Sequence, residues 1–435
     1  MPELSIGFSR SPRPEQAAEE LARALEQAFA GGSAVTGGLL LATAAAGSQG
    51  VEVGRILAAR WPQAELLGTS FEGLVAHGEL WRDRPALVLC AWSEAIGSPA
   101  PFAMEPGERD PARIAHEILS AADCSVLGPE DLVLLFPDAG AGLPIGILLR
   151  ELEPLLGDAS IAGAAASGSS GEPVPAWLDE EEAKGSLVGI VFPSPRPRQQ
   201  PGPEGVASRV ATASASRASS PWLTVTRCSG HWVERIEGER ALDWVRGQLG
   251  LGRRAPLERP LERLLVRVRR PTEPRDGSRR PSKPDAGARG AEPRVDADAD
   301  GEAADASGEV GEERFVIGVD ERAGSFSLPV PILSGDELAF SLPDPTRARS
   351  ALREGIEGLE RTAGLIHFGC RTRDASLHGG EELEPALLAH LARDRAVFGT
   401  IGPLQIGPDA SRRTRLLVHA TVLAALGSSG RDSDR

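Results

Sequence analysis

A cysteine followed by two arginines stands near the end of the chain, in the segment Gly369-Cys370-Arg371-Thr372-Arg373. Residues 365–370 have the apolar character of a buried strand, and cations beside the end of that strand could stabilise a Cys370 thiolate. Such a thiolate is a nucleophile, and His378 or His419 could serve as its base. A thiol-dependent or acid/base hydrolase is therefore one alternative. A small buried core cysteine explains the same residue, and we favour it.

Carboxylates give two weaker signals. Asp138 ends a predicted strand and precedes glycines, so its carboxylate could hold a ligand amine or make a local turn hydrogen bond, and both interpretations stay open. Glu72 and Glu79 could share acid and base roles. A solvated strand face explains that pair better, and we expect the chain not to be an enzyme.

Other motifs do not support a cofactor or a metal. The glycines of residues 140–146 follow a strand, but their spacing is G-x-G-x-x-x-G, Pro144 removes an amide, and the next strand lacks an acidic residue for a ribose. The segment 68–73 lacks the G-x-S-x-G spacing of a serine hydrolase. His116-Glu117 has no second histidine at metalloprotease spacing, and the four cysteines are widely separated. We expect no cofactor and no metal.

Apolar runs alternating with helical patterns predict the elements that would position these residues. Strands are expected near residues 4–8, 39–41, 64–67, 86–92, 132–136 and 187–192, and again near 222–225, 264–268, 315–319, 338–340, 365–370, 396–401 and 416–418. Asp344 is a plausible N-cap with Pro345 at the first helical position. The pattern predicts two α/β domains with mixed β-sheets flanked by helices.

Composition sets the expected boundaries. The first domain spans residues 1–192, a Pro/Ser/Arg-rich linker 193–220, and the second domain 221–426, followed by a polar tail at 427–435. Within the second domain, residues 271–312 are too poor in apolar side chains to order, so we expect a disordered acidic loop. That loop could recruit a basic partner, which makes a protein-interaction scaffold a further alternative.

The net charge of −15 opposes binding to nucleic acid, and no apolar run approaches the length that spans a bilayer. We expect a cytoplasmic protein with reduced cysteines and no membrane partner. Only two of the 47 basic residues are lysines, which indicates a GC-rich bacterial genome.

Several glycine-rich segments resemble the FIST family of sensory proteins. Residues 67–73, together with Gly78-Glu79, resemble the family's GCSAEG…G…E segment. Residues 136–138 resemble its aspartate-containing turn, and residues 161–168 resemble the glycine- and serine-containing segment that comes next. In the second half, residues 225–227, 335–338, 369–373 and 377–379 resemble the FIST C-terminal domain. Residues 404–408 resemble a GEIGP element, with Gln405 in place of glutamate, and His419 and Thr421 lie in the strand that follows.

The resemblance implies an intracellular sensory module that binds small ligands, including amino acids, and signals to a separate partner protein, with no output domain of its own. Arg373 would hold a ligand carboxylate and Asp138 a ligand ammonium. Glycine-lined turns from both halves would form one cleft. Its expected residues are Gly68, Thr69, Ser70, Glu72, Asp138, Gly163, Ser167, Gly168, Cys370, Arg373, Gln405 and His419.

Overall fold

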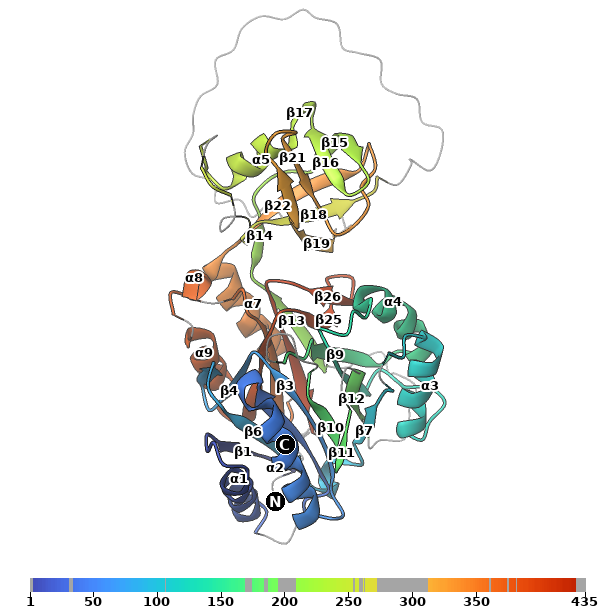
Figure 1. Cartoon of the computed structure of the whole chain (residues 1–435), viewed down its shortest axis with the longest axis vertical. Coiled ribbons are helices and arrows are strands. Elements are labelled where there is room, and N and C mark those ends of the chain that lie inside the picture. The colour runs from blue at the N-terminus through green and yellow to red at the C-terminus, as the bar shows by residue number, and fades with distance from the viewer. Residues whose placement is uncertain are drawn as a thin grey trace, which may run out of the picture. The chain divides into compact units, whose positions relative to one another are not determined.

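The computed structural model of the chain describes residues 3–30, 34–105, 107–168, 174–183, 187–194, 209–252, 255–257, 261, 263–271, 312–359, 361–373, 375–380 and 382–427. Within these ranges the fold is the mixed α/β class that the sequence predicts. The chain divides into two compact units (Figure 1). The larger unit comprises residues 1–217 and 342–435, and the smaller unit comprises residues 218–341.

These units follow other boundaries than those expected from composition. Residues from 342 onward pack with the first part of the chain, because β27 (Ala420–Leu426) pairs with β13 (Val210–Ser214) and β24 (Ala396–Gly402) pairs with β4 (Gly73–Ala76). Strand β13 lies inside the expected linker, so residues 210–214 are not linker. Its side chains are small, so the strand lacks the large apolar residues from which the other strands were predicted. Most of the expected disordered loop, residues 272–311, lies outside the described residues, as do residues 195–208.

Three six-stranded sheets form the larger unit in the part of the chain that the structure describes. The first has the order β1 (Leu4–Ser9), β6 (Leu87–Trp92), β2 (Gly37–Thr43), β3 (Glu65–Phe71), β10 (Ala176–Leu178) and β11 (Glu181–Glu182). The second has the order β7 (Ala100–Ala103), β12 (Leu187–Phe192), β8 (Leu132–Pro137), β9 (Ser160–Ala164), β25 (Gln405–Pro408) and β26 (Thr414–Leu417). The third has the order β13, β27, β23 (Gly364–Cys370), β24, β4 and β5 (Glu79–Arg82).

All three sheets are built on the same plan. Each has an edge strand, its antiparallel neighbour, a parallel pair and a hairpin, in that order. The parallel pairs share one register, with partners Leu40 and Gly68, Leu135 and Gly163, and His367 and Gly399. We infer three structural repeats, residues 4–92, 100–192 and 210–426, with the smaller unit inserted into the third between β13 and α7.

The helices repeat in the same way and cover the outer faces of the sheets (Figure 1). Each edge strand leads through a helix to the first parallel strand, and these helices are α1 (Pro14–Ala28), α3 (Pro111–Ala121) and α7 (Pro345–Gly358). All three begin with proline, and Asp110 and the predicted cap Asp344 accept hydrogen bonds from the first turns of α3 and α7. The helices between the parallel strands are α2 (Gly47–Arg60), α4 (Ile145–Leu156), and α8 (Ala375–His378) with α9 (Leu383–Leu391); short 3-10 turns occur at Ala44–Ala46 and Glu94–Ile96.

The hairpins are exchanged between the repeats. The hairpin β4–β5 of the first repeat extends the third sheet, β10–β11 of the second repeat extends the first sheet, and β25–β26 of the third repeat extends the second sheet. Each sheet therefore takes its last two strands from a repeat other than its own. The exchange ties the three repeats into one unit.

The inner faces of the three sheets share one apolar core. Equivalent positions contribute to it from every repeat, for example Leu41, Phe136 and Phe368. The ring of Phe136 lies 5.7 Å from that of Phe71 and 6.0 Å from that of Phe368, measured between centroids, so aromatic rings from all three repeats meet. Separate apolar clusters lie between each sheet and its helices.

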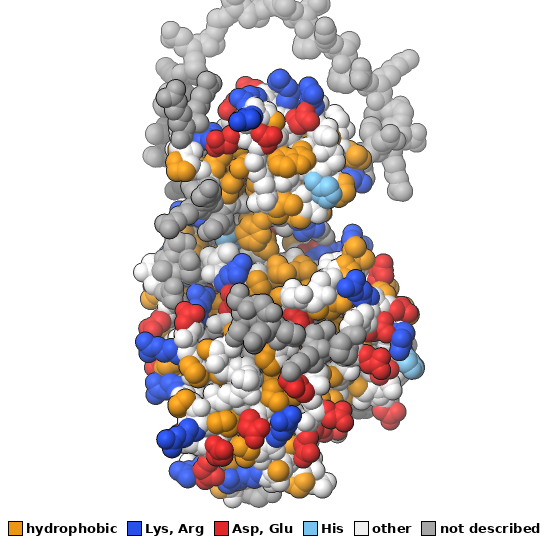
Figure 2. All heavy atoms as spheres, viewed as in Figure 1, with side chains coloured by type: hydrophobic (Ala, Val, Ile, Leu, Met, Phe, Trp, Pro, Cys, Tyr) orange, Lys and Arg blue, Asp and Glu red, His pale blue; other side chains and the backbone are white. Residues whose placement is uncertain are grey.

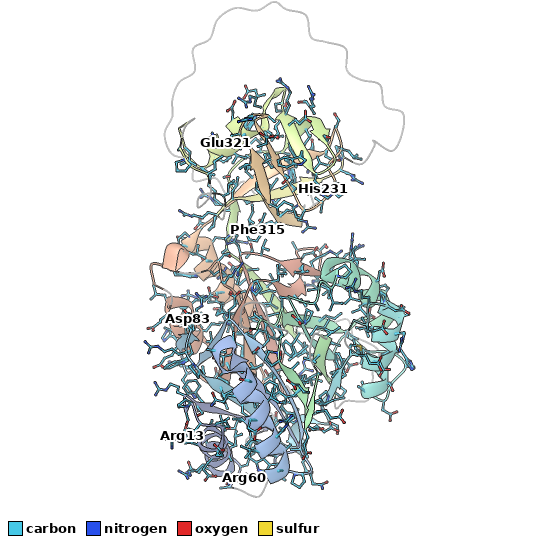
Figure 3. The ribbon with its side chains drawn as sticks, in the orientation of Figure 1. Arg13, Arg60, Asp83, His231, Phe315 and Glu321 are labelled. Atoms are coloured by element: carbon cyan, nitrogen blue, oxygen red, sulfur yellow. The ribbon has the colours of Figure 1, made fainter. Side chains whose placement is uncertain are left out.

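Charged side chains decorate the outside of the larger unit. Arg60 of α2, labelled in Figure 3, pairs with Glu19 and Glu26 of α1 at 2.6 and 2.8 Å, and thus links two neighbouring helices. On the face that Figure 2 shows, acidic and basic side chains are interspersed. No helix among the described residues is long and apolar enough to cross a membrane.

The smaller unit is a single curled sheet with one described helix, α5 (Ala241–Gln248). Its strands run in the order β19 (Glu312–Phe315), β18 (Leu265–Arg269), β22 (Glu337–Pro343), β15 (Leu223–Ser229), β16 (Trp232–Ile236), β21 (Ser325–Ser327) and β20 (Gly318–Asp320), while β14 (Ser216–Ala218) pairs with β22 and β17 (Glu239–Arg240) with β16. Its centre is apolar, with Val225, Val233, Phe326 and Phe340 fully buried. All the site residues expected from the sequence lie in the larger unit.

Candidate functional site

The carboxyl ends of the three parallel pairs provide equivalent positions for polar side chains. Thr43, Asp138 and Cys370 occupy the same register position, one at the end of the first parallel strand of each repeat. Each of them comes two residues after a core residue, which is Leu41, Phe136 or Phe368, and therefore lies on the same face of its strand. Ligands of open α/β sheets bind outside the carboxyl ends of parallel strands. This end of the shared core is therefore the candidate site, and we call it the polar end.

Hydrogen bonds join the repeats at the polar end. Ser70, at the end of β3, donates through its Oγ to the carbonyl of Ser167 at 2.8 Å. The backbone carbonyl of Ser70 accepts from the amide of Ser167, also at 2.8 Å. The amide of Ala165 donates to the carbonyl of Leu404 at 3.0 Å, which brings the start of β25 to the end of β9. The structure thus brings Ser70, Ser167 and Gln405 to neighbouring strand ends.

A surface ion pair links the first and third repeats in the same region. Arg371 contacts Glu72 at 2.9 Å, and both side chains are partly exposed to solvent. An exposed pair of this kind contributes about 0–1 kcal/mol. It places the expected site residue Glu72 beside the segment that contains Cys370.

Gln405 breaks the pattern of the repeats. The strand registers make it equivalent to Leu74 and Ala176, and both of those belong to the apolar core. Gln405 is fully buried, and its Nε2 donates to the carbonyls of Gly369 and Gly402 at 3.0 Å each. Its Oε1 has no hydrogen-bond partner among the described residues. A buried acceptor is therefore left without a donor at the polar end.

Thr400 repeats this feature on the neighbouring strand. Its equivalents are Thr69, whose Oγ1 donates to the carbonyl of Pro175 at 3.3 Å, and Ala164, which has no hydroxyl. Thr400 is fully buried, and its Oγ1 finds no partner in the described ranges. Sequence reasoning missed Thr400. The signal was the Gly-Thr dipeptide, which occurs at the same place in the first and third repeats.

Asp138 and Ser167 are partly engaged by the backbone. Asp138 is buried, and its Oδ1 accepts from the Gly140 amide at 2.7 Å while Oδ2 accepts from the Val174 amide at a long 3.4 Å. The first bond is the local turn contact anticipated as one interpretation of Asp138. The Oγ of Ser167 has no partner within the described part of the chain. Gly168 follows it and is partly exposed.

Two of the expected cleft glycines are accounted for by packing. A Cβ on Gly163 would lie 1.9 Å from the carbonyl oxygen of Leu135 in the neighbouring strand. A Cβ on Gly68 would lie 2.0 Å from the indole ring of Trp177. The space above each glycine is occupied by the protein itself. These glycines permit close packing within the sheets.

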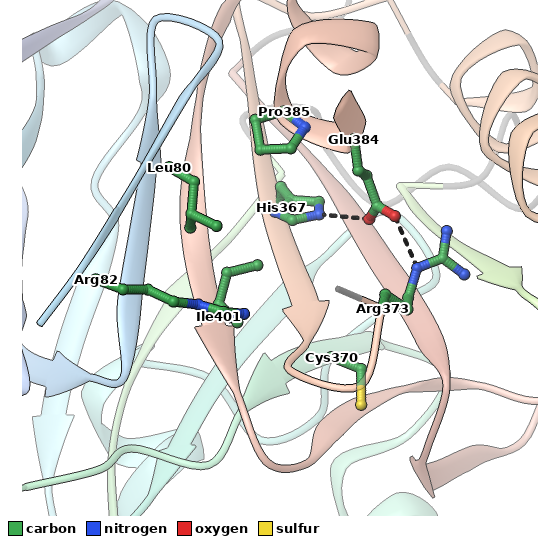
Figure 4. A pocket seen from close by; sticks show the side chains of 8 residues that line it. All are labelled: Leu80, Arg82, His367, Cys370, Arg373, Glu384, Pro385 and Ile401. Carbon is green, nitrogen blue, oxygen red and sulfur yellow. Dashed lines mark hydrogen bonds and ion pairs between the residues drawn. The ribbon is translucent and has the colours of Figure 1, made fainter. Parts of the chain in front are cut away.

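A second polar cluster lies on the outer face of the third sheet, beneath α9 (Figure 4). Glu384 of α9 is buried and accepts hydrogen bonds from Arg373 Nε at 2.8 Å, His367 Nε2 at 3.1 Å and His378 Nε2 at 2.8 Å. Thr421 Oγ1 also donates to it. Sequence reasoning missed Glu384, whose signal was a lone acidic residue among the apolar residues of 383–391.

Arg373 is held within this cluster. Besides Glu384, its guanidinium donates to the carbonyls of Ala213 and His419 at 3.3 Å each. No contact joins Arg373 to Asp138 among the described residues. The two side chains expected to hold opposite ends of an amino acid thus have separate partners.

The cluster sets the ionisation of Glu384. Burial acts most strongly and would raise the pKa, but the charge of Arg373 and the hydrogen bonds from His367 and His378 outweigh it. The pKa of Glu384 therefore lies well below its ordinary value of 4.5.

This depressed pKa predicts acid sensitivity. A carboxyl whose pKa is lower in the folded than in the unfolded chain stabilises the fold above its unfolded pKa and loses that contribution as pH falls toward its folded pKa. We therefore expect the free energy of unfolding to decrease as pH drops below about 4.5. Urea unfolding from pH 3 to 7 measures it. Glu384→Gln should show a shallower acid dependence, and equal slopes for the two proteins would contradict the prediction.

The cavity beside this cluster is small. It is lined by Leu80, Arg82, His367, Cys370, Arg373, Glu384, Pro385 and Ile401, and its free space is about 10 Å³. A volume of that size holds roughly one water molecule. A metabolite would need side chains to move before it could enter here.

Cys370 contacts Thr372 and is almost fully buried. Its Sγ lies 3.0 Å from Thr372 Oγ1, which in turn lies 2.9 Å from His419 Nδ1. Figure 4 shows the sulfur pointing away from Glu384. His378, the other candidate base, contacts Glu384. All four cysteines are free thiols, and no group of His, Cys, Asp or Glu among the described residues is arranged to hold a metal ion.

Comparison with known proteins adds to this geometry. No curated protein matches the chain. Residues 38–239 match the FIST N domain, a sensory domain that binds small ligands in signal transduction. The matched range includes Ser70, Asp138 and Ser167. The resemblance to the FIST family drawn from the sequence is confirmed over residues 38–239, which are similar to the family's N domain.

Proposed function

We propose that this protein is a cytoplasmic sensory module that binds a small molecule at the polar end and reports its occupancy to a separate signalling protein. It binds its ligand without transforming it. The residues that follow the matched range, 240–427, would correspond to the FIST C-terminal domain that the sequence resembles.

One observation carries the location of the site. Gln405 replaces an apolar residue of the repeat pattern, and its buried Oε1 has no partner in the part of the chain that the structure describes. A buried polar group without a partner costs about 1–3 kcal/mol. The equivalent positions in the other two repeats carry leucine and alanine. That this chain has Gln405 here despite the cost supports a role for the Gln405 side chain in binding.

Amino acids are the first ligand class to test. The resemblance to the FIST family implies them, and their ammonium group could donate to Gln405 Oε1. Phe136 and Phe368 of the adjoining core would lie near an apolar ligand side chain.

A ligand that binds only the folded protein raises its melting temperature. Screening by thermal shift against the twenty amino acids, polyamines and nucleobases should find at least one compound that raises it. At a ligand concentration about one hundred times Kd the gain is about 2.7 kcal/mol, which corresponds to about 5–11 °C for a domain of 150–250 residues, and less is expected for the larger unit. Titration calorimetry would then give Kd.

Arg60→Ala provides the control, because this side chain lies on the outside of α2. The variant should show the same ligand-induced shift as the natural protein. Failure of the whole panel to shift the melting temperature would contradict the proposal.

A further inference from the structure

The hydrogen-bonding character of the polar end indicates which part of a ligand it recognises. The orientation of the Gln405 amide is fixed by its neighbours, because Nε2 faces the carbonyl oxygens of Gly369 and Gly402, which can only accept. The remaining atom, Oε1, is therefore an acceptor. It has no donor among the described residues.

Thr400 could contact the same ligand group as Gln405. Its hydroxyl can accept one hydrogen bond and donate another, and its Oγ1 has no partner within the described residues. It stands on β24 two residues before Gly402, whose carbonyl Gln405 contacts. Both residues are therefore placed near Gly402, at the end of β24.

The charges nearby disfavour an acidic ligand group. Arg371 pairs with Glu72. Arg373 lies on the outer face of the third sheet, where it pairs with Glu384 and its Nη2 has no partner among the described residues. Asp138, at the polar end itself, is a buried carboxylate. An anionic group placed here would meet acceptors and a carboxylate, and burying an unpaired charge is costly.

We propose that the polar end recognises a ligand through a primary amine, ammonium or primary amide group, with Gln405 Oε1 and Thr400 Oγ1 as acceptors of its N–H bonds. This inference rests on the proposed function and specifies the ligand chemistry of the same site. The carboxylate of an amino acid would contribute little to its affinity. Neither Gln405 nor Thr400 transfers a proton or forms a covalent bond in this role.

A matched series of probes separates the two ends of the ligand. Leucine, leucinamide, isoamylamine and N-acetyl-leucine keep one side chain while the amine and the carboxylate are changed in turn, and glycine, glycinamide and N-acetylglycine repeat the comparison without a side chain. Calorimetry should show that amidation or removal of the carboxylate changes Kd less than tenfold. Acetylation of the amine should weaken binding at least a hundredfold.

Thr400→Val tests the position of the site with little change in volume. It should weaken binding of leucinamide about tenfold, which corresponds to about 1.4 kcal/mol. The unliganded variant should melt at the same or a higher temperature, because the lost hydroxyl had no partner. Thr362→Val is the matched control, because Thr362 precedes β23, at the other end of that strand from Cys370, and its buried hydroxyl already donates to the carbonyl of Gly364 at 2.9 Å; this variant should leave the Kd for leucinamide unchanged.

The outcomes distinguish this inference from the proposed function. Tight binding of the N-acetyl compounds together with loss of the amines would overturn the amine class and leave small-molecule sensing standing. An unchanged leucinamide Kd in Thr400→Val would overturn the assigned acceptor. If neither these probes nor the wider metabolite panel binds, the proposed function itself is contradicted.

Discussion

Replacing Arg373 by methionine should lower the free energy of unfolding by about 3–5 kcal/mol. The Arg373 side chain is 1% exposed and its partner Glu384 is 5% exposed, so the substitution leaves a carboxylate buried without its cation. His367, His378 and Thr421 still donate to Glu384, but none of these donors carries the fixed charge of a guanidinium. Equilibrium unfolding in urea at pH 7 measures the loss.

The chain contains a matched control two residues earlier. Arg371 also pairs with a glutamate, but its side chain is 56% exposed, so Arg371→Met should cost about 1 kcal/mol or less. The double variant Arg373→Met with Glu384→Gln removes both charges and should recover part of the loss. A cost for Arg373→Met as small as that of Arg371→Met would contradict the role assigned to the buried pair.

Replacing Gly163 by alanine should destabilise the larger unit by about 3 kcal/mol or more. The new Cβ would meet the carbonyl oxygen of Leu135 at 1.9 Å, and that oxygen belongs to the backbone of a central parallel strand. Relief requires the strands β8 and β9 to separate, because no rotamer change can move a backbone carbonyl. Thermal or urea unfolding of the purified variant measures the effect.

Gly355→Ala provides the control in the same unit. Gly355 lies in helix α7, and a Cβ there would make an ordinary contact of 3.5 Å with Leu423. This substitution should raise stability by about 0.5–1 kcal/mol, because alanine favours the helix. A Gly163→Ala variant as stable as the natural protein would contradict the close approach of strands β8 and β9 at Gly163.

The local elements could be predicted because their signals are local. Runs such as residues 132–136 and 365–370 form strands β8 and β23, and the pair Asp344-Pro345 starts α7 as predicted. Short elements gave too weak a pattern, for example β13 with its small side chains and the four-residue strands β4 and β5. Register depends on partners distant in the sequence, so composition could not reveal the exchange of hairpins.

The site was predictable only in part for the same reason. Gln405 and Asp138 were found because they stand in recognisable segments. That Gln405 occupies a core position is visible only when its register is compared with those of Leu74 and Ala176. The partner of Arg373 could not be predicted either, because Glu384 comes from a helix packed over the sheet.

The third repeat differs from the other two in several respects. It carries Gln405 in the shared core and the Glu384 cluster on its outer face, and it holds the inserted smaller unit between β13 and α7. Asp344 at the start of α7 donates its amide to Ala215, just after β13. The proposed ligand contacts and the insertion thus belong to the same repeat.

A crystal structure of the protein with leucinamide, or with whichever amine binds most tightly, tests the central claim most directly. We predict that a ligand nitrogen lies within about 3 Å of Gln405 Oε1, with Thr400 Oγ1 as a neighbouring partner. A ligand bound elsewhere, with Gln405 Oε1 and Thr400 Oγ1 still lacking any partner, would contradict it.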